Sequence, residues 1–465
     1  MFRLIQKLDL MRIVLGICMV VDGPPLITFL KETVHLAPNS QAFTAAFQGL
    51  GFVLMIPFTF LRRLYTPNIL LFWMAIWFII LCIFYMFYFN GEPGFKGYAT
   101  DLTYFAFSLV FILLLLNVPN DIIEVAIPVI ILFTFISNLA LLYAMVTDPT
   151  WSIGQRAAIN YGTTDTGERM GNPHIFARNA LMCVVACGVW AFRSQTGPLM
   201  RIATLFTGAF SIAILIMTQT RSSIVALAIV VGLFLFFNVR PAQIKSAIRG
   251  LRHPFSLITI FLMFFAFSMF VRKYNDVYGI LYGYAVSFME RNLENVYALL
   301  GLQSSGAAYK AALDASAANR AVSANFFSNV VVGHMEMLIF GNGYKFLYLD
   351  VPVMEAWVNH GIPGLVLFGG MNILILYYCF RVMKNNPNPL STFLAYFYIL
   401  IFVQLFTNGR PYEQSFWYPL GLMIRFIGIE SLFPVRLWNN PPSVDYNGYA
   451  VPSALSATDD ETAAS

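Results

Sequence analysis

The sequence predicts an all-α, polytopic integral membrane protein. Of its 465 residues, 58% are hydrophobic and only 11% are charged, and the mean hydropathy is +0.70. A soluble chain of this length would carry roughly twice that charged fraction. Apolar runs of about 17 to 25 residues recur along the chain, and each is long enough to cross a bilayer as a helix. These observations exclude an ordinary soluble fold.

The apolar runs predict about twelve membrane spans within a single transmembrane domain, residues 1–434. Residues 272–353 form a large loop in that domain, and their apolar spacing predicts helices lying against the membrane face. Residues 435–465 are rich in Ala, Ser, Asp and Glu, which predicts a disordered tail. The predicted spans lie near 9–29, 40–60, 69–89, 102–118, 122–146, 174–193, 198–218, 222–238, 255–271, 354–380, 390–408 and 416–433.

The basic residues predict the orientation of these spans. Lys and Arg collect in the cytoplasmic loops of membrane proteins, and alternate connections here are rich in them, above all "RPAQIKSAIRGLRH" at 240–253. Both termini are therefore expected in the cytoplasm, with 147–173 and 272–353 outside. The same bias accounts for the net charge of +5, so that charge does not indicate a nucleic-acid partner.

Neither disulfides nor a metal are expected. The outer loops have no tight acidic cluster of the D-x-D kind that would hold Mg²⁺, and no other cofactor is indicated. All five cysteines lie within apolar runs, where they cannot staple an extramembrane loop. They are Cys18, Cys82, Cys183, Cys187 and Cys379.

Arg221 stands between two predicted spans, in "IMTQTRSSIVALAIVVG" at the outside face. One interpretation is an interfacial arginine that snorkels to lipid phosphates. The other is an anion site, because a guanidinium is always charged and matches phosphate oxygens in a bidentate way. Other outside segments add basic or polar candidates: Arg169, His174 and Arg178 in "TTDTGERMGNPHIFAR", Arg320 upstream of "FGNGYKFLYLD" with Tyr344, and Arg410 in "NGRPYEQS".

Asp350 ends the long loop just before the span near 354, and "HGIPG" follows about three turns later. A helix N-cap or a first-turn acid facing the helix dipole would explain Asp350 alone. It would not explain why a carboxylate stands beside several outside arginines.

These elements, in this order, resemble the superfamily of bacterial O-antigen ligases and Wzy-type repeat-unit polymerases. "GERMGNPHIFA" resembles the family's G-x-x-x-N-P-N element, with His174 in place of an Asn. "TQTRSSIVAL" resembles S-x-S-R before an apolar span, with Thr218 and Thr220 replacing serines. Arg320 through "MLIFGNG", and then Asp350 through "GIPG", resemble the last two elements. The resemblance covers roughly 150–370.

The resemblance implies a GT-C-like membrane glycosyltransferase that uses undecaprenyl-pyrophosphate-linked glycan at the periplasmic face of the inner membrane. Arg221 and Arg320 would then stabilise the pyrophosphate leaving group, and Asp350 would act as general base. Arg410, Arg178, Arg169, His174 and Tyr344 would bind substrate. The lipid bilayer and, from the same pathway, a flippase and a chain-length regulator would be partners. No metal is implied.

Four interpretations remain open at this point, one of which is a non-enzymatic assembly scaffold. A polymerase is favoured over a ligase, because ligases typically have His at the position of Asp350. A flippase or other transporter is the rival class. It would place charges near the bilayer midplane, where Arg425 in "LMIRFIGIE" is the strongest candidate.

Overall fold

A computed structural model describes residues 2–59, 62–88, 98–152, 155–163, 169–193, 196–238, 315–349, 351–407 and 409–433, together with short stretches between 261 and 289. The described chain is almost entirely helical, so the predicted all-α class is confirmed. Its single sheet pairs two short antiparallel strands, β1 (Asn160–Thr163) and β2 (Arg169–Gly171). The predicted span 255–271, the loop residues 277–302 and the tail 435–465 lie wholly or largely outside the described residues.

Seven helices in the described part of the chain are long and apolar enough to cross a membrane. Six are single helices, and the seventh is a 34-residue run in which α16 (Pro352–Gly364) continues through η3 (Leu365–Gly370) into α17 (Met371–Asn385). The single helices are α4 (Ile69–Tyr88), α5 (Tyr98–Asn117), α6 (Ala126–Thr147), α7 (Pro173–Ala191), α8 (Pro198–Thr218) and α9 (Arg221–Asn238).

The first predicted span is a broken one. Helix α1 (Phe2–Asp22) ends before two consecutive prolines, and the chain turns by 73° into α2 (Pro24–Thr28) and η1 (Phe29–Thr33). Proline has no N–H to continue the helical hydrogen bonds, so Pro24 and Pro25 account for the break. Counted as one span, this pair raises the number of candidate spans to eight.

Three further predicted spans coincide with helices that are too short to count. These are α3 (Gln41–Met55), α18 (Pro389–Gln404) and α19 (Gln414–Phe426). The 16 residues of α18 rise about 24 Å, which is less than the roughly 30 Å of a hydrocarbon core. Most predicted apolar helices therefore lie where they were expected, while the described residues do not confirm twelve spans.

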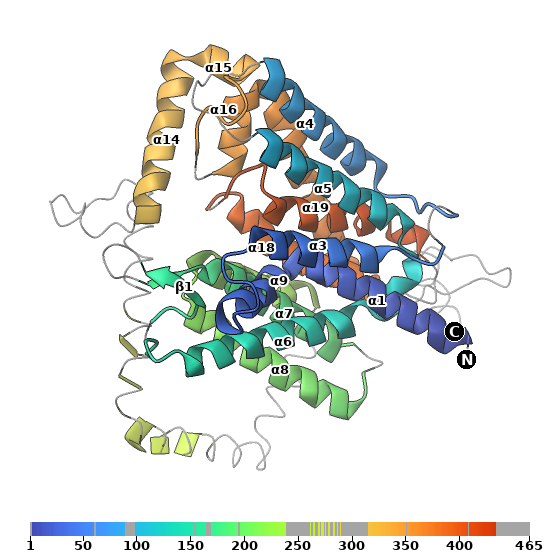
Figure 1. Ribbon diagram of the computed structural model, residues 1–465, viewed down its shortest axis with the longest axis vertical. Coiled ribbons are helices and arrows are strands. Elements are labelled where there is room, and N and C mark those ends of the chain that lie inside the picture. Colours follow the sequence, from blue (N-terminus) through green and yellow to red (C-terminus); the bar gives the residue numbers. More distant parts are fainter. Residues whose placement is uncertain are drawn as a thin grey trace, which may run out of the picture.

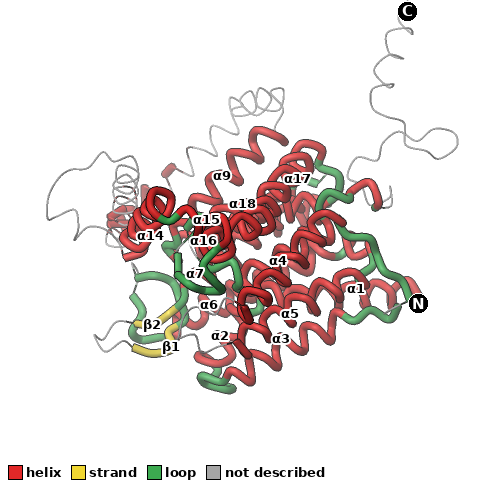
Figure 2. The backbone as a smooth tube through the Cα atoms, turned by 90° about the horizontal axis from the view of Figure 1, so that it is seen from above, coloured by secondary structure: helices red, strands yellow, loops and turns green. Residues whose placement is uncertain are grey.

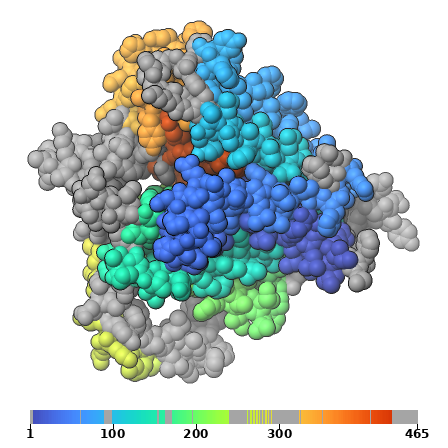
Figure 3. All heavy atoms as spheres, viewed as in Figure 1, coloured from blue at the N-terminus to red at the C-terminus, as the bar shows by residue number. Residues whose placement is uncertain are grey.

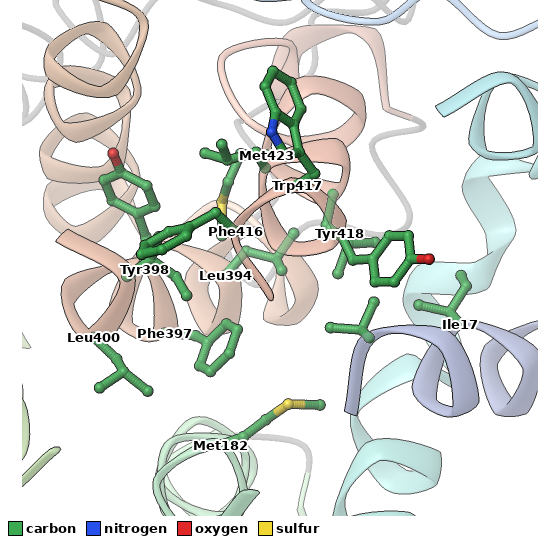
Figure 4. Packing of buried hydrophobic residues seen from close by; sticks show 14 of the residues in the cluster. Ile17, Met182, Leu394, Phe397, Tyr398, Leu400, Phe416, Trp417, Tyr418 and Met423 are labelled. Carbon is green, nitrogen blue, oxygen red and sulfur yellow. The ribbon is translucent and has the colours of Figure 1, made fainter. Parts of the chain in front are cut away.

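Helix α18 lies at the centre of the bundle. Every residue from Pro389 to Ile401 is buried, and α18 contacts α6, α7, α9, α17 and α19. Figure 4 shows Leu394 and Phe397 of α18 among Met182 of α7 and Trp417 of α19. An all-round apolar helix of this kind is typical of a position enclosed by other helices.

The irregular and polar segments gather at one end of the bundle, which we call the loop end. It carries the β1–β2 hairpin, α14 (Ala315–Gly333), α15 (Met335–Phe340) and the connection 405–413 between α18 and α19. Figures 1 and 2 show β1, β2 and α14 at this end and the N-terminus of α1 at the other. Helices α14 and α15 agree with the helices predicted inside 272–353.

Candidate functional site

A buried ion pair lies at the loop end, where α16 begins. Glu355, in the first turn of α16, is fully buried. Its Oε1 accepts a hydrogen bond of 2.7 Å from Nε of Arg410, and its Oε2 accepts one of 3.1 Å from the backbone N–H of Leu349. A carboxylate without water is stable only when it is paired and hydrogen-bonded, and here both oxygens are.

Arg410 is held through Nε, and its side chain is partly exposed. Its side chain is 23% exposed, and its carbon Cζ lies 5.1 Å from the ring centroid of Tyr348 and 5.9 Å from that of Tyr412. Within the described residues, Arg410 makes only the side-chain hydrogen bond through Nε. Neither of its two Nη atoms donates to a residue that the structure describes.

Two glycine elements that are separate in the sequence meet beside this pair. Gly341 and Gly361 both have positive φ, of 76° and 65°. A Cβ on Gly341 would lie 2.5 Å from the carbonyl oxygen of Asn359, and one on Gly361 would lie 2.3 Å from that of Ile339. Only glycine tolerates this combination of backbone angle and close approach. The "FGNG" and "HGIPG" elements thus form one structural unit.

The loop between these elements is anchored to α5. Lys345 donates to both carboxylate oxygens of Asp101, at 2.8 and 2.7 Å. The hydroxyl of Tyr85 in α4 donates to the carbonyl of Phe340, and the indole of Trp357 donates to that of Leu338 at 3.0 Å. The loop that leads to α16 is therefore fixed on several sides.

Aromatic and amide side chains close the inner side of the site. The rings of Tyr344 and Tyr412 lie 4.7 Å apart, and the amide of Asn359 donates to the Tyr412 hydroxyl at 3.2 Å. His360 is fully buried against Tyr412 and Tyr85. Burial raises the pKa of both Tyr344 and Tyr412, so these phenols remain neutral hydrogen-bonding groups.

Arg178 is used inside the protein. It is buried in α7 and donates to the carbonyl of Ser415 at 2.7 Å and to that of Val21 at 3.2 Å. Its guanidinium also lies 5.8 Å from the ring of Phe397, and buried Asp22 attracts it. Arg178 therefore joins the ends of α1 and α7 to the segment that carries Arg410, which is a positioning role.

Arg221 lies on a separate hairpin, as the first residue of α9, with a partly buried side chain. The preceding Gln219 has a φ of 54°, and the segment before β1 packs on this turn: Ala157 donates to the Met217 carbonyl at 2.9 Å, and Arg156 to that of Gln219 at 3.4 Å. The helix N-terminus adds its own positive dipole to that of the guanidinium, which favours an anion.

The structure describes the surroundings of His174 but not those of three other predicted residues. His174 is half-buried in the first turn of α7, where its backbone N–H is capped by the side chain of Asn172 at 3.1 Å. The "NP" element therefore has a local role as a helix N-cap. Arg169 lies in β2 and Arg320 lies in α14, with the side chains of both outside the described part of the structure. Asp350 itself lies outside the described residues, between Leu349 and Val351.

Glu355 and its partner were not predicted together. A carboxylate inside an apolar run is a recognised indication of function, and that signal was present in "VPVMEAWV". Its pairing with Arg410 depends on tertiary packing across 55 residues.

Arg425 has a structural explanation. It is buried and donates to the carbonyls of Leu115 and Val118, at 3.1 and 3.0 Å, and to the side chain of Asn120 at 2.6 Å. These bonds satisfy the end of α5 and the turn that follows. Arg425 therefore gives no support to a transport pathway.

No protein-family model matches the chain, and no curated protein sequence matches it. Among the described residues, no three His, Cys, Asp or Glu side chains gather as metal ligands would. The five cysteines are buried and free.

Proposed function

We propose that this chain is a membrane glycosyltransferase that joins oligosaccharide repeat units carried on undecaprenyl pyrophosphate. The observation that carries the proposal is Arg410, a partly accessible guanidinium held at the loop end by the fully buried Glu355. The sequence resemblance supplies the substrate class, and the predicted orientation puts the loop end in the periplasm.

In the proposed reaction, an acceptor sugar hydroxyl attacks the anomeric carbon of the donor glycan. A new C–O glycosidic bond forms, the bond from the anomeric carbon to the phosphate oxygen breaks, and the lipid leaves as its pyrophosphate. The difficulty is the negative charge that develops on the leaving oxygen. Guanidiniums that are fixed before the reaction stabilise such charge without reorganising.

Arg410 has the geometry for this task. Glu355 occupies Nε, so the orientation of the planar guanidinium is fixed while its two Nη atoms bond no described residue. Glu355 is a positioning residue in this scheme, because both its oxygens are occupied and it is closed to solvent. Arg221, at the positive end of α9, is the second proposed pyrophosphate contact.

A general base must take the proton of the acceptor hydroxyl. Glu355 does not suit this role, since its oxygens already accept from Arg410 and Leu349. We therefore keep the role for Asp350. Its neighbours fit a site position: Leu349 bonds to Glu355, and Val351 is the N-cap residue of α16.

The experiment that tests the proposal is deletion of the gene in the producing cells, followed by analysis of lipid-linked glycan. Accumulation of single repeat units at the periplasmic face of the inner membrane would support a polymerase. Long polymer remaining on undecaprenyl lipid would instead indicate a ligase. Units stranded at the inner face would indicate a flippase, and both of these outcomes would contradict the proposed polymerase.

A further inference from the structure

A polar pocket lies at the loop end, built mainly by the N-terminal part of the chain. Its volume is about 290 Å³, close to the lower limit of about 300 Å³ for small-molecule sites. Six of its polar lining residues come from η1, the turn before α3, α3 itself and β1: Lys31, Glu32, Asn39, Thr44, Gln48 and Tyr161. In Figure 3 the blue N-terminal segment lies on the visible face, next to the teal α6.

Local structure in the N-terminal segment positions the walls of this pocket. The 73° turn after α1 sends α2 and η1 across the helix ends, so Lys31 and Glu32 form one wall. Ser40 caps α3 by accepting from the backbone N–H of Phe43 at 3.2 Å. Thr44 and Gln48 are four residues apart on α3 and therefore lie on one face of it.

Thr44 of the pocket donates to the Ser40 carbonyl at 3.4 Å, but four other polar side chains have no such use in the described part of the chain. Lys31, Glu32, Asn39 and Gln48 make no side-chain hydrogen bond or ion pair with any residue that the structure describes. Elsewhere at the loop end, charged side chains such as Lys345 and Arg410 are paired. A group of unused donors and acceptors around one pocket indicates a polar ligand.

The combination of charges narrows the class of ligand. The charges of Lys31 and Glu32 cancel. A phosphate in the pocket would lie near the Glu32 carboxylate, and a simple cation would lie near the Lys31 ammonium group, so neither is favoured. The amides of Asn39 and Gln48 each donate and accept, as sugar hydroxyls do. Tyr161 is 43% exposed and offers an aromatic surface to the C–H face of a sugar ring.

We propose that this pocket binds one sugar unit of the glycan substrate, away from the bond that reacts. This inference rests on the proposed glycosyltransferase function. Arg178 links the segments that lead to the two places, because it bonds the Val21 carbonyl just before α2 and the Ser415 carbonyl just after Arg410. In this proposal, one glycan is held at two points of the loop end.

The test uses Gln48→Ala and Asn39→Gly in the purified full-length protein. Glycine is chosen at position 39 because its φ of 56° would strain alanine. Gln41→Ala is the matched control, an exposed amide at the start of α3 that does not line the pocket. Melting temperatures within the range of the wild type and the control establish that each variant is folded. If a pocket variant is not folded, Thr44→Val is tested in its place.

Two readouts separate this inference from the proposed function. The first is extension of lipid-linked single repeat units: the pocket variants should raise KM roughly tenfold with little change in kcat, as expected for two lost hydrogen bonds. The second is saturation-transfer NMR with the repeat-unit oligosaccharide released from its lipid. Signal transfer should appear with the wild type and Gln41→Ala and disappear with the pocket variants.

Unchanged KM and unchanged NMR transfer in the pocket variants would overturn the sugar pocket, whatever the activity of the wild type. If the wild type binds the oligosaccharide in this pocket but extends no lipid-linked unit, the proposed polymerase function is overturned and the proposed sugar binding is not.

Discussion

Glu355 and Arg410 form an ion pair of 2.7 Å in which the carboxylate is fully buried and the guanidinium is partly exposed. This asymmetry has a consequence for the chemistry of the loop end. The buried partner holds Nε of the guanidinium, and neither Nη atom donates to a residue that the structure describes. Glu355 therefore fixes the position of Arg410, and Arg410 is the partner that solvent can reach.

Glu355→Gln should lower the rate of transfer, because the amide can still accept from Arg410 but no longer supplies the opposing charge. We expect kcat to fall by roughly 10- to 100-fold, which corresponds to about 1.4 to 2.7 kcal/mol of transition-state stabilisation. The measurement is steady-state extension of lipid-linked units by purified variants.

A double-mutant cycle shows whether Glu355 acts through Arg410. The losses in Glu355→Gln and Arg410→Ala should be strongly non-additive, since the two side chains form one unit. Additive losses would mean that Glu355 affects activity by another route.

Arg221→Lys should lose most activity, because a point charge cannot reproduce the planar fork of a guanidinium. The control is Arg201→Lys, an exposed arginine at the start of α8 and hence at the other end of that helix. Polymer length in cells reports the outcome. Near-normal polymer with Arg221→Lys would remove this residue from the site.

Asp350→Asn should abolish transfer while the protein is still inserted and expressed, because an amide cannot accept the proton of the acceptor hydroxyl. Membrane abundance and polymer formation are measured in the same cells. Full activity in this variant would eliminate Asp350 as the general base.

Gly361→Ala should destabilise the protein and impair activity. A Cβ at this position would lie 2.3 Å from the Ile339 carbonyl oxygen at a φ of 65°, and strain of this kind costs about 1 to 3 kcal/mol. Gly370→Ala is the control, since its Cβ would meet nothing nearer than the Met74 side chain at 3.5 Å. Thermal unfolding in detergent compares the two, and equal melting temperatures would contradict the close packing of Gly341 and Gly361.

The apolar pattern was sufficient to locate most helices. The predicted 198–218 coincides with α8, and 222–238 differs from α9 by one residue. The number of crossing helices was harder to predict, because length decides it. Hydropathy does not distinguish a spanning helix from α18, which is short and enclosed by other helices. The break at Gly23 depended on two prolines inside an apolar run.

The structure places the predicted candidate residues in different surroundings. The sequence indicated Arg410 and the two glycine elements, and the structure brings these together. It also indicated Arg178 as a substrate contact, whereas the structure occupies that guanidinium with the Val21 and Ser415 carbonyls. Tertiary packing decides whether an arginine faces a ligand or holds helices together. The neighbouring residues in the sequence do not indicate which of the two roles applies.

The most direct test of the central claim is reconstitution of the purified chain in liposomes that contain lipid-linked single repeat units. The account predicts a ladder of longer lipid-linked glycans with the wild type and a much weaker ladder with Arg410→Ala. Units that remain single with the wild type, or a ladder of equal intensity with Arg410→Ala, would contradict it.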